Sequence, residues 1–119
     1  MKVIVAGSRS ITDLSVVELA IKDSALQATE IVSGGACGVD RLGERWASNH
    51  RLPIKRFTAQ WATRGYGAGY VRNREMAHYA DALVAVWDGR SGGTRHMIET
   101  MQAAGKPVFV SIWNMGRRP

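Results

Sequence analysis

The stretch EIVSGGACGVDRLGERWAS, residues 30–48, reads as a strand, a glycine-rich turn and a helix in immediate succession. Residues 30–33 form a short apolar run that ends at Gly34 and Gly35, as is typical of a buried strand. Residues 39–48 follow, with Leu42, Trp46 and Ala47 on one side of the expected helix. A unit of this kind is the building block of a parallel α/β sheet.

The rest of the chain repeats this alternation. Strands are predicted at residues 2–6, 30–33, 53–57, 82–87 and 107–112, and helices at residues 13–26, 39–48, 70–79 and 94–104. Residues 60–69 are expected to form a loop. Right-handed crossovers, with a switch point beside the first strand, predict a Rossmann-like three-layer α/β domain. Its parallel five-stranded sheet has the expected order 3-2-1-4-5, with the strands numbered along the chain.

Composition favours one folded domain, predicted at residues 1–115, followed by a basic tail at residues 116–119. Of the 119 residues 45% are hydrophobic and 22% are charged, close to the average for globular proteins. We expect no membrane association and a cytoplasmic protein, because no apolar stretch approaches the roughly 20 residues that span a bilayer. With a single cysteine, Cys37, the chain has no internal disulfide.

Three strands run into glycine-containing turns, which are GSR at residues 7–9, SGGACGVD at residues 33–40 and WDGRSGGT at residues 87–94. In a parallel sheet these turns converge beside the switch point, where ligands bind. Glycine lets the backbone approach a ligand, and the free N–H groups of a helix N-terminus can hold a phosphate. Such turns also connect strands to helices without any ligand, so the set of three carries the argument. The candidate ligand-binding residues in them are Gly7, Ser8, Arg9, Ser33, Gly34, Gly35, Gly38, Ser91, Gly92, Gly93 and Thr94.

Other polar residues are candidates for the same site. Arg72 and Asn73 open a helix after the glycine loop, and an arginine there suits phosphate, although pairing with Glu75 is the alternative. Asp40 is expected to cap a helix or to bind a ribose hydroxyl. Asp88 is a candidate catalytic and ligand-binding residue or a turn-forming Asp-Gly residue.

Arg72, Asp88 and Glu99 are the candidate catalytic residues. Glu99 either faces the pocket as a general acid or base or points to solvent. The three histidines, His50, His78 and His96, lack the spacing of a metal site, so we predict no bound metal and no cofactor.

Taken in order, the segments GSR, SGGACGVDRLGERWA, WATRGYGAGYVRNREM (residues 61–76), AVWDGRSGGT and AGKPV resemble the SLOG superfamily, and its YspA-related branch most closely. This resemblance implies a Rossmann-like fold with a nucleotide or nucleotide-derived ligand at the glycine turns. Because self-association is common in that superfamily, the resemblance also implies a homo-oligomer.

More distant members include LOG-type phosphoribohydrolases, which split the N-glycosidic bond of nucleoside 5′-monophosphates. Arg72 and Met76 match their Arg-Lys-x-x-Met segment, with Asn73 in place of the lysine. Gly93 and Thr94 match part of their Gly-Gly-x-Gly-Thr-x-x-Glu segment, but Met97 stands at the position of the catalytic glutamate. This departure weakens the hydrolase interpretation.

Three functions follow as hypotheses. The leading one is a pocket that binds a phosphorylated, nucleotide-type small molecule. The second is a nucleoside 5′-monophosphate phosphoribohydrolase in which Asp88 or Asp40 stabilises the developing positive charge. The third is single-stranded DNA binding of the DprA type, using the formal net charge of +6 and aromatic residues such as Trp61 and Tyr66. It is the weakest, because the basic residues are not clustered.

Overall fold

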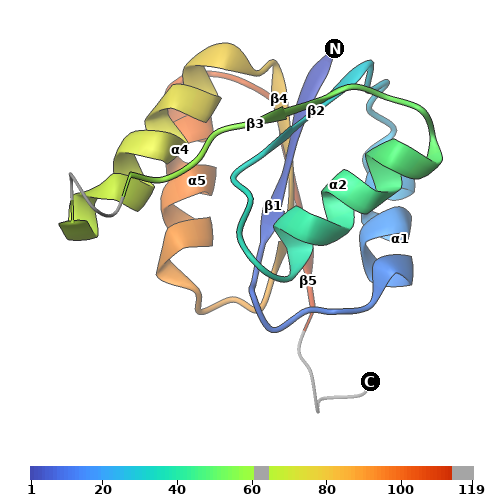
Figure 1. Cartoon of the computed structure of the whole chain (residues 1–119), viewed down its shortest axis with the longest axis horizontal. Coiled ribbons are helices and arrows are strands. Elements are labelled where there is room, and N and C mark those ends of the chain that lie inside the picture. The colour runs from blue at the N-terminus through green and yellow to red at the C-terminus, as the bar shows by residue number, and fades with distance from the viewer. Residues whose placement is uncertain (61–64, 114–119) are drawn as a thin grey trace.

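A computed structural model describes residues 1–60 and 65–113, except for the side chain of Tyr66. The strands are β1 (Lys2–Gly7), β2 (Glu30–Ser33), β3 (Ile54–Arg56), β4 (Ala82–Trp87) and β5 (Val108–Ile112). The helices are α1 (Leu14–Ser24), α2 (Val39–Asn49), α4 (Ala68–Tyr79) and α5 (Gly92–Ala103), and a 3₁₀ turn, η1 (Gly65–Gly67), leads into α4. Strands and helices alternate along the chain (Figure 1).

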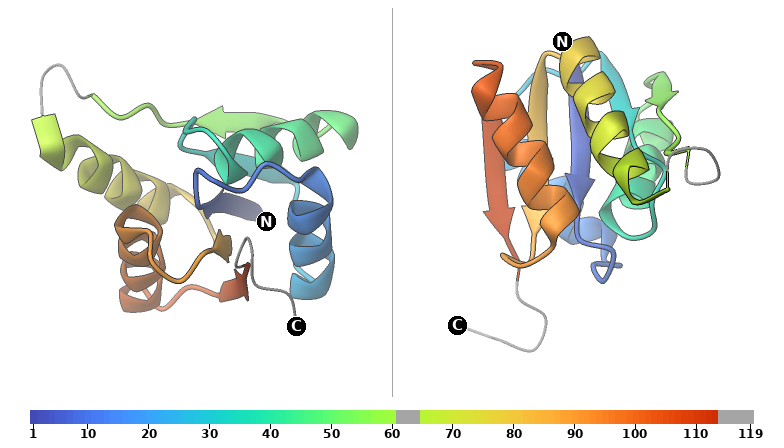
Figure 2. Two further views of the ribbon diagram at one scale, coloured as in Figure 1. Left: turned by 90° about the horizontal axis from the view of Figure 1, so that it is seen from below. Right: turned by 90° about the vertical axis from the view of Figure 1, so that its left-hand side faces the viewer.

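The described strands form one parallel sheet in the order β3-β2-β1-β4-β5. In the centre, β1 pairs with β2 on one side and with β4 on the other. Helices α1 and α2 cover one face, and α4 and α5 cover the opposite face (Figure 2). The predicted fold class and strand order are confirmed. The carboxyl ends of β1, β2 and β4 therefore lie side by side at the switch point.

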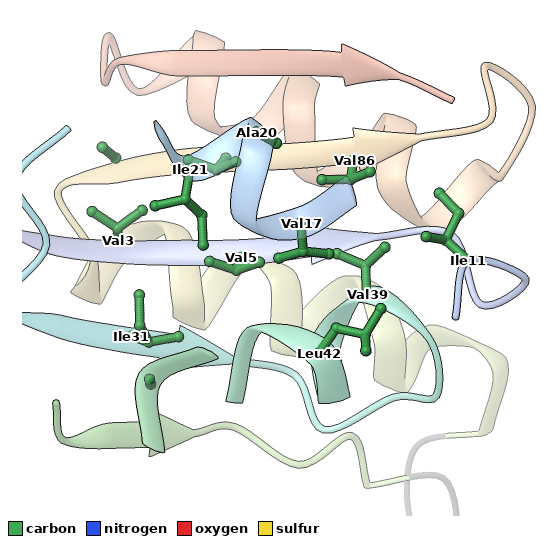
Figure 3. Packing of buried hydrophobic residues seen from close by; sticks show 13 residues of the cluster. Val3, Val5, Ile11, Val17, Ala20, Ile21, Ile31, Val39, Leu42 and Val86 are labelled. Carbon is green, nitrogen blue, oxygen red and sulfur yellow. The ribbon is translucent and has the colours of Figure 1, made fainter. Parts of the chain in front are cut away.

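Alternate side chains of β1 enter two separate cores, because successive residues of a strand point to opposite faces. Val3 and Val5 pack with α1 and α2 (Figure 3). Ile4 and Ala6 pack with α4 and α5. Each of these four side chains is at most 8% exposed. Burial on both faces explains why the N-terminal run is apolar without alternation.

Some element boundaries differ from the prediction. Helix α4 begins at Ala68, two residues earlier than expected, because the buried Ala68 and its neighbour Gly69 continue the helix rather than the loop. Helix α5 begins at Gly92 instead of residue 94, since Ser91 takes the N-cap position. Strand β3 is shorter than residues 53–57 and exposed along its length, as an edge strand can be.

No helix in the described ranges is long and apolar enough to cross a membrane. Cys37 is exposed. The basic tail at residues 116–119 and Trp61 lie outside the described residues, as does the Tyr66 side chain.

Candidate functional site

A cavity of about 580 Å³ lies where the turns after β1, β2 and β4 meet the first turns of α4 and α5. Nine of the residues proposed from the sequence line it, and they are Gly7, Arg9, Asp40, Arg72, Asn73, Asp88, Ser91, Gly93 and Thr94. The elements that contribute these residues are far apart in the chain. The fold therefore brings most of the candidate residues together in one cavity.

Seven other candidates do not line this cavity, and they are Ser8, Ser33, Gly34, Gly35, Gly38, Gly92 and Glu99. Glu99 is exposed on α5. Five of them position the residues that do line the cavity, through backbone and side-chain contacts, and they are Ser8, Ser33, Gly34, Gly35 and Gly38. Gly92 has open space where a Cβ would lie.

Arg72 and Asp40 form the charged wall of the cavity. The Arg72 Nη1 group donates a hydrogen bond to the Gly34 carbonyl at 3.2 Å. Among the described residues the buried Arg72 Nε atom has no hydrogen-bond partner. Burial lowers the pKa of Arg72 from its usual value, and the charge of Asp40 opposes that effect. Arg72 also lines the cavity, and a guanidinium has five N–H donors, so donors other than Nε remain for an anionic ligand.

Asp40 lies in the first turn of α2 and is 5% exposed. Its Oδ2 atom accepts a hydrogen bond from the Ala36 N–H at 3.2 Å, so the carboxyl group fixes the preceding turn rather than capping the helix. The N-cap is Gly38, which makes no side-chain cap. Burial raises the pKa of Asp40 to about 6, although the Ala36 N–H and the charge of Arg72 act in the other direction.

Two glycines set the shape of this wall. A Cβ atom at Gly34 would lie 2.8 Å from Asp40 Oδ2 and 3.2 Å from Arg72 Cζ, so glycine leaves room for the charged pair. Gly38 has a φ of +73°, and a Cβ there would lie 2.5 Å from the Ser8 carbonyl oxygen. That carbonyl accepts the Val39 N–H, which ties the turn after β1 to the start of α2.

Ser33 supports the turn from below and is fully buried. Its hydroxyl donates to Glu44 at 2.6 Å and accepts the Gly35 N–H at 3.0 Å. Arg56 on β3 pairs with the same glutamate. Although burial opposes it, hydrogen bonding to Arg56 and Ser33 lowers the pKa of Glu44. These contacts assign Ser33 to the framework of the site.

Asp88 organises the turn between β4 and α5. Its Oδ1 atom accepts the N–H groups of Arg90 and Ser91, both at 2.8 Å. The hydroxyl of Ser8 accepts the Asp88 N–H at 2.9 Å, which links this turn to the one after β1. Hydrogen bonding from Ser91 and Arg90 lowers the pKa of Asp88 to about 2. At neutral pH the cavity thus contains one firmly ionised carboxylate here.

Asn73 and His96 connect the two helices that form the opposite wall. Asn73 is 3% exposed, and its side-chain amide donates to the Gly93 carbonyl and to His96 Nδ1, each at 3.1 Å. Burial, followed by the charge of Arg74, lowers the pKa of His96. A neutral imidazole that accepts at Nδ1 carries its proton on Nε2.

Sequence reasoning missed seven residues that line the cavity, and they are Ala6, Ser10, Ala36, Gly69, Tyr70, Met76 and Met97. Tyr70 is an exposed aromatic residue two positions before Arg72, and this proximity was a usable signal. Met97, 1% exposed, occupies the place of the LOG-type glutamate, so an apolar side chain faces the cavity there. No group of three or more potential metal-ligating His, Cys, Asp or Glu residues occurs within the described part of the chain.

Comparison with known proteins assigns the chain to a family. The profile of the YspA, cpYpsA-related SLOG family matches residues 1–63. The chain belongs to this family. The chain is also similar to the Gene 61 protein of Mycobacterium phage D29, with 36% identity over 127 aligned residues that cover 99% of this chain and 98% of the phage protein. No solved structure matches the chain.

The SLOG match includes β1, α1, β2, α2 and β3. Two of the three glycine turns, with Arg9 and Asp40, fall within it. The walls contributed by α4 and α5 lie beyond residue 63, outside the family match. Tyr70, Arg72 and Asn73 are therefore assigned to the site only because they line the cavity in this structure. Membership of the SLOG family points to a nucleotide-related function, and the name of the phage relative adds no activity.

Proposed function

We propose that this protein binds a phosphorylated, nucleotide-type small molecule in the cavity at the carboxyl ends of β1, β2 and β4. The observation that carries the proposal is that Arg9, Arg72 and the N-terminus of α5 all border one cavity. Each of these features attracts an anion, and together they suit a phosphate group. A cavity of about 580 Å³ has the size of ordinary small-molecule sites.

The start of α5 supports the phosphate part of the ligand. Its N-cap, Ser91, makes no side-chain cap, and Gly93 and Thr94 line the cavity. The first N–H groups of a helix have no partner within the helix, and the helix dipole adds a partial positive charge there. Both glycines of this turn leave their surroundings open, so a phosphate can approach the backbone.

Arg72 supports the same interpretation because its partial burial costs free energy, which a ligand of opposite charge would offset. It is half-buried, one of its nitrogen atoms is buried without a described partner, and Arg9 adds a second positive charge. A buried donor that lacks a partner destabilises a protein by about 1–3 kcal/mol. A bound anion would instead offset part of the free energy lost by burying the guanidinium charge.

A second candidate function is hydrolysis of the N-glycosidic bond of a nucleoside 5′-monophosphate. The observation in its favour is that two carboxyl groups line the cavity with widely separated pKa values, about 6 for Asp40 and about 2 for Asp88. Such separation is typical of acid and base pairs in enzymes. Water would cleave the N-glycosidic bond and release the free base and ribose 5-phosphate. Chromatography of each incubated nucleotide distinguishes this function from simple binding.

The test is isothermal titration calorimetry with AMP, GMP, CMP, UMP, ADP-ribose and cyclic AMP. We expect at least one of these to bind, and Arg72→Ala to weaken that binding about tenfold to a hundredfold, as for a lost charged hydrogen bond. Arg72→Lys keeps the charge without the two-pronged geometry and should fall in between. Because no metal is proposed, EDTA should leave the affinity unchanged.

Arg45→Ala is the matched control, because this substitution also removes one positive charge. Arg45 is exposed on α2 and does not line the cavity. Circular dichroism verifies that each variant is folded. Equal affinities of the wild-type protein and Arg72→Ala would remove Arg72 from the site. Failure of all six nucleotides to bind would refute the proposed function.

A further inference from the structure

The cavity has two walls of opposite character. Where α4 faces β2 and α2, Arg72 of α4 contacts Gly34 and lies beside Asp40. On the side of α4 and α5, Tyr70, Met76 and Met97 present aromatic and thioether groups. Met76 and Met97 are each 1% exposed and belong to the core beneath this wall. A ligand that fits both walls needs a charged part and a flat or apolar part.

Tyr70 is the accessible member of the apolar wall. It lies in the first turn of α4, lines the cavity and is 47% exposed, which is high for a large side chain beside a core. Its ring packs against the ring of His96 on α5, with centroids 4.4 Å apart and planes inclined by 47°. Within the described residues, Tyr70 neither packs in the hydrophobic cores nor forms a side-chain hydrogen bond that would explain its position.

His96 is itself held in place, so the support under Tyr70 is fixed. The Asn73 amide donates to His96 Nδ1 at 3.1 Å, and the same amide nitrogen is anchored to the Gly93 carbonyl. Asn73 also lines the cavity. Burial lowers the pKa of His96, which favours the neutral form of the ring against Tyr70. Because the Tyr70 ring is oriented before a ligand arrives, less side-chain entropy is lost when a ligand stacks on it.

We propose that Tyr70 is the stacking surface for the heterocyclic base of the ligand. This inference rests on the proposed function and narrows it, because it requires a ligand that keeps its base, as a nucleotide does, and not a sugar phosphate. Stacking of a base on an aromatic side chain contributes enough energy to change affinity about tenfold to a hundredfold. The phosphate lies toward Arg72 and the start of α5, and the base lies over Tyr70.

Calorimetry with AMP, GMP and ribose 5-phosphate tests this assignment on the wild-type protein, Tyr70→Ala and Tyr70→Phe. We expect the wild-type protein to prefer a nucleotide over ribose 5-phosphate. Tyr70→Ala should lose about tenfold to a hundredfold in affinity for that nucleotide and nothing for ribose 5-phosphate, so that the preference disappears. Tyr70→Phe keeps the ring and should retain the preference.

Leu19→Ala is the control, because Leu19 is 58% exposed on α1 and does not line the cavity. If a nucleotide binds and Tyr70→Ala retains the full preference over ribose 5-phosphate, the stacking role is wrong while the proposed function stands. Equal binding of ribose 5-phosphate and both nucleotides to the wild-type protein would likewise overturn it. If neither AMP nor GMP binds, the same comparison uses whichever of CMP, UMP, ADP-ribose and cyclic AMP does bind, and failure of all six nucleotides overturns both proposals. Thermal unfolding of Tyr70→Ala confirms that a lost preference does not reflect a lost fold.

Discussion

Asp40 shows how one buried residue couples the site to pH. Its pKa in the folded protein is about 6, above the value of 3.8 for an unperturbed aspartate, so the folded state holds the proton more tightly. Stability from this group is therefore fully present below about pH 4 and is lost as the pH rises through about 6. Each pKa unit corresponds to about 1.4 kcal/mol, which makes the loss on the order of 2–3 kcal/mol.

Asp40→Asn removes this titration and should abolish the pH dependence that Asp40 causes. Urea unfolding of both proteins between pH 4 and pH 8 measures it. We expect the free energy of unfolding of the wild-type protein, relative to Asp40→Asn, to fall as the pH rises. Asp88 and Glu44, whose pKa values are lowered, act in the opposite direction but are common to both proteins and cancel. A difference that rises with pH would mean that the Arg72 charge outweighs burial.

Residue roles were harder to predict than residue positions. Asp40, Arg72 and Asp88 were singled out from the sequence, and all three line the cavity. The expectation that Asp40 caps α2 was wrong, because Gly38 occupies the N-cap and the carboxyl group instead accepts the Ala36 N–H. The alternative partner for Arg72, Glu75, is not the one the fold provides, which is the Gly34 carbonyl beside Asp40. Contacts between turns far apart in sequence decide these roles.

Helix α2 is the element on which the charged wall depends. It carries Asp40 and Glu44 and packs closely on the central strand through Gly43. A Cβ atom at Gly43 would lie 2.7 Å from Val5 Cβ, which is too close for the present packing. Helix and strand would have to separate, and the turn after β2 would move with the helix.

Gly43→Ala should therefore destabilise the protein by about 1–3 kcal/mol, the usual effect of overpacking a core. Urea unfolding measures this change, with Ser48→Ala as control, because Ser48 is an exposed residue of the same helix. The higher helix propensity of alanine, about 1 kcal/mol relative to glycine, acts against this destabilisation, so any observed loss of stability reflects the overpacking. A stability equal to or above that of the wild-type protein would show that α2 and β1 can adjust without cost.

Elements with an unbroken apolar run were predicted best. Strands β2 and β4 have the predicted bounds, since each is a continuous buried run that ends in a polar or glycine turn. The starts of α4 and α5 were placed too late because glycine is unfavourable inside helices, yet Gly69, Gly92 and Gly93 all lie in first turns. Tertiary contacts override propensity at helix ends.

At the scale of the whole molecule, strand order follows from the sequence because few topologies satisfy parallel pairing with short right-handed crossovers. Order β3-β2-β1-β4-β5 places three glycine turns at one edge of the sheet. The ligand does not follow from that arrangement, since the same fold serves many functions. Homo-oligomer formation, implied by the SLOG resemblance, stays a prediction.

On the proposed function, one cavity at the switch point binds the nucleotide. A titration of ¹⁵N-labelled protein with the nucleotide that binds most tightly in calorimetry, followed by two-dimensional NMR, is the first measurement to make. We expect the amide signals that move to belong to the turns after β1, β2 and β4 and to the starts of α4 and α5, with Gly7, Gly93 and Thr94 among them. Movement confined to the groove of Lys55, Phe57 and His78 between β3 and α4, or none at all, would contradict the account.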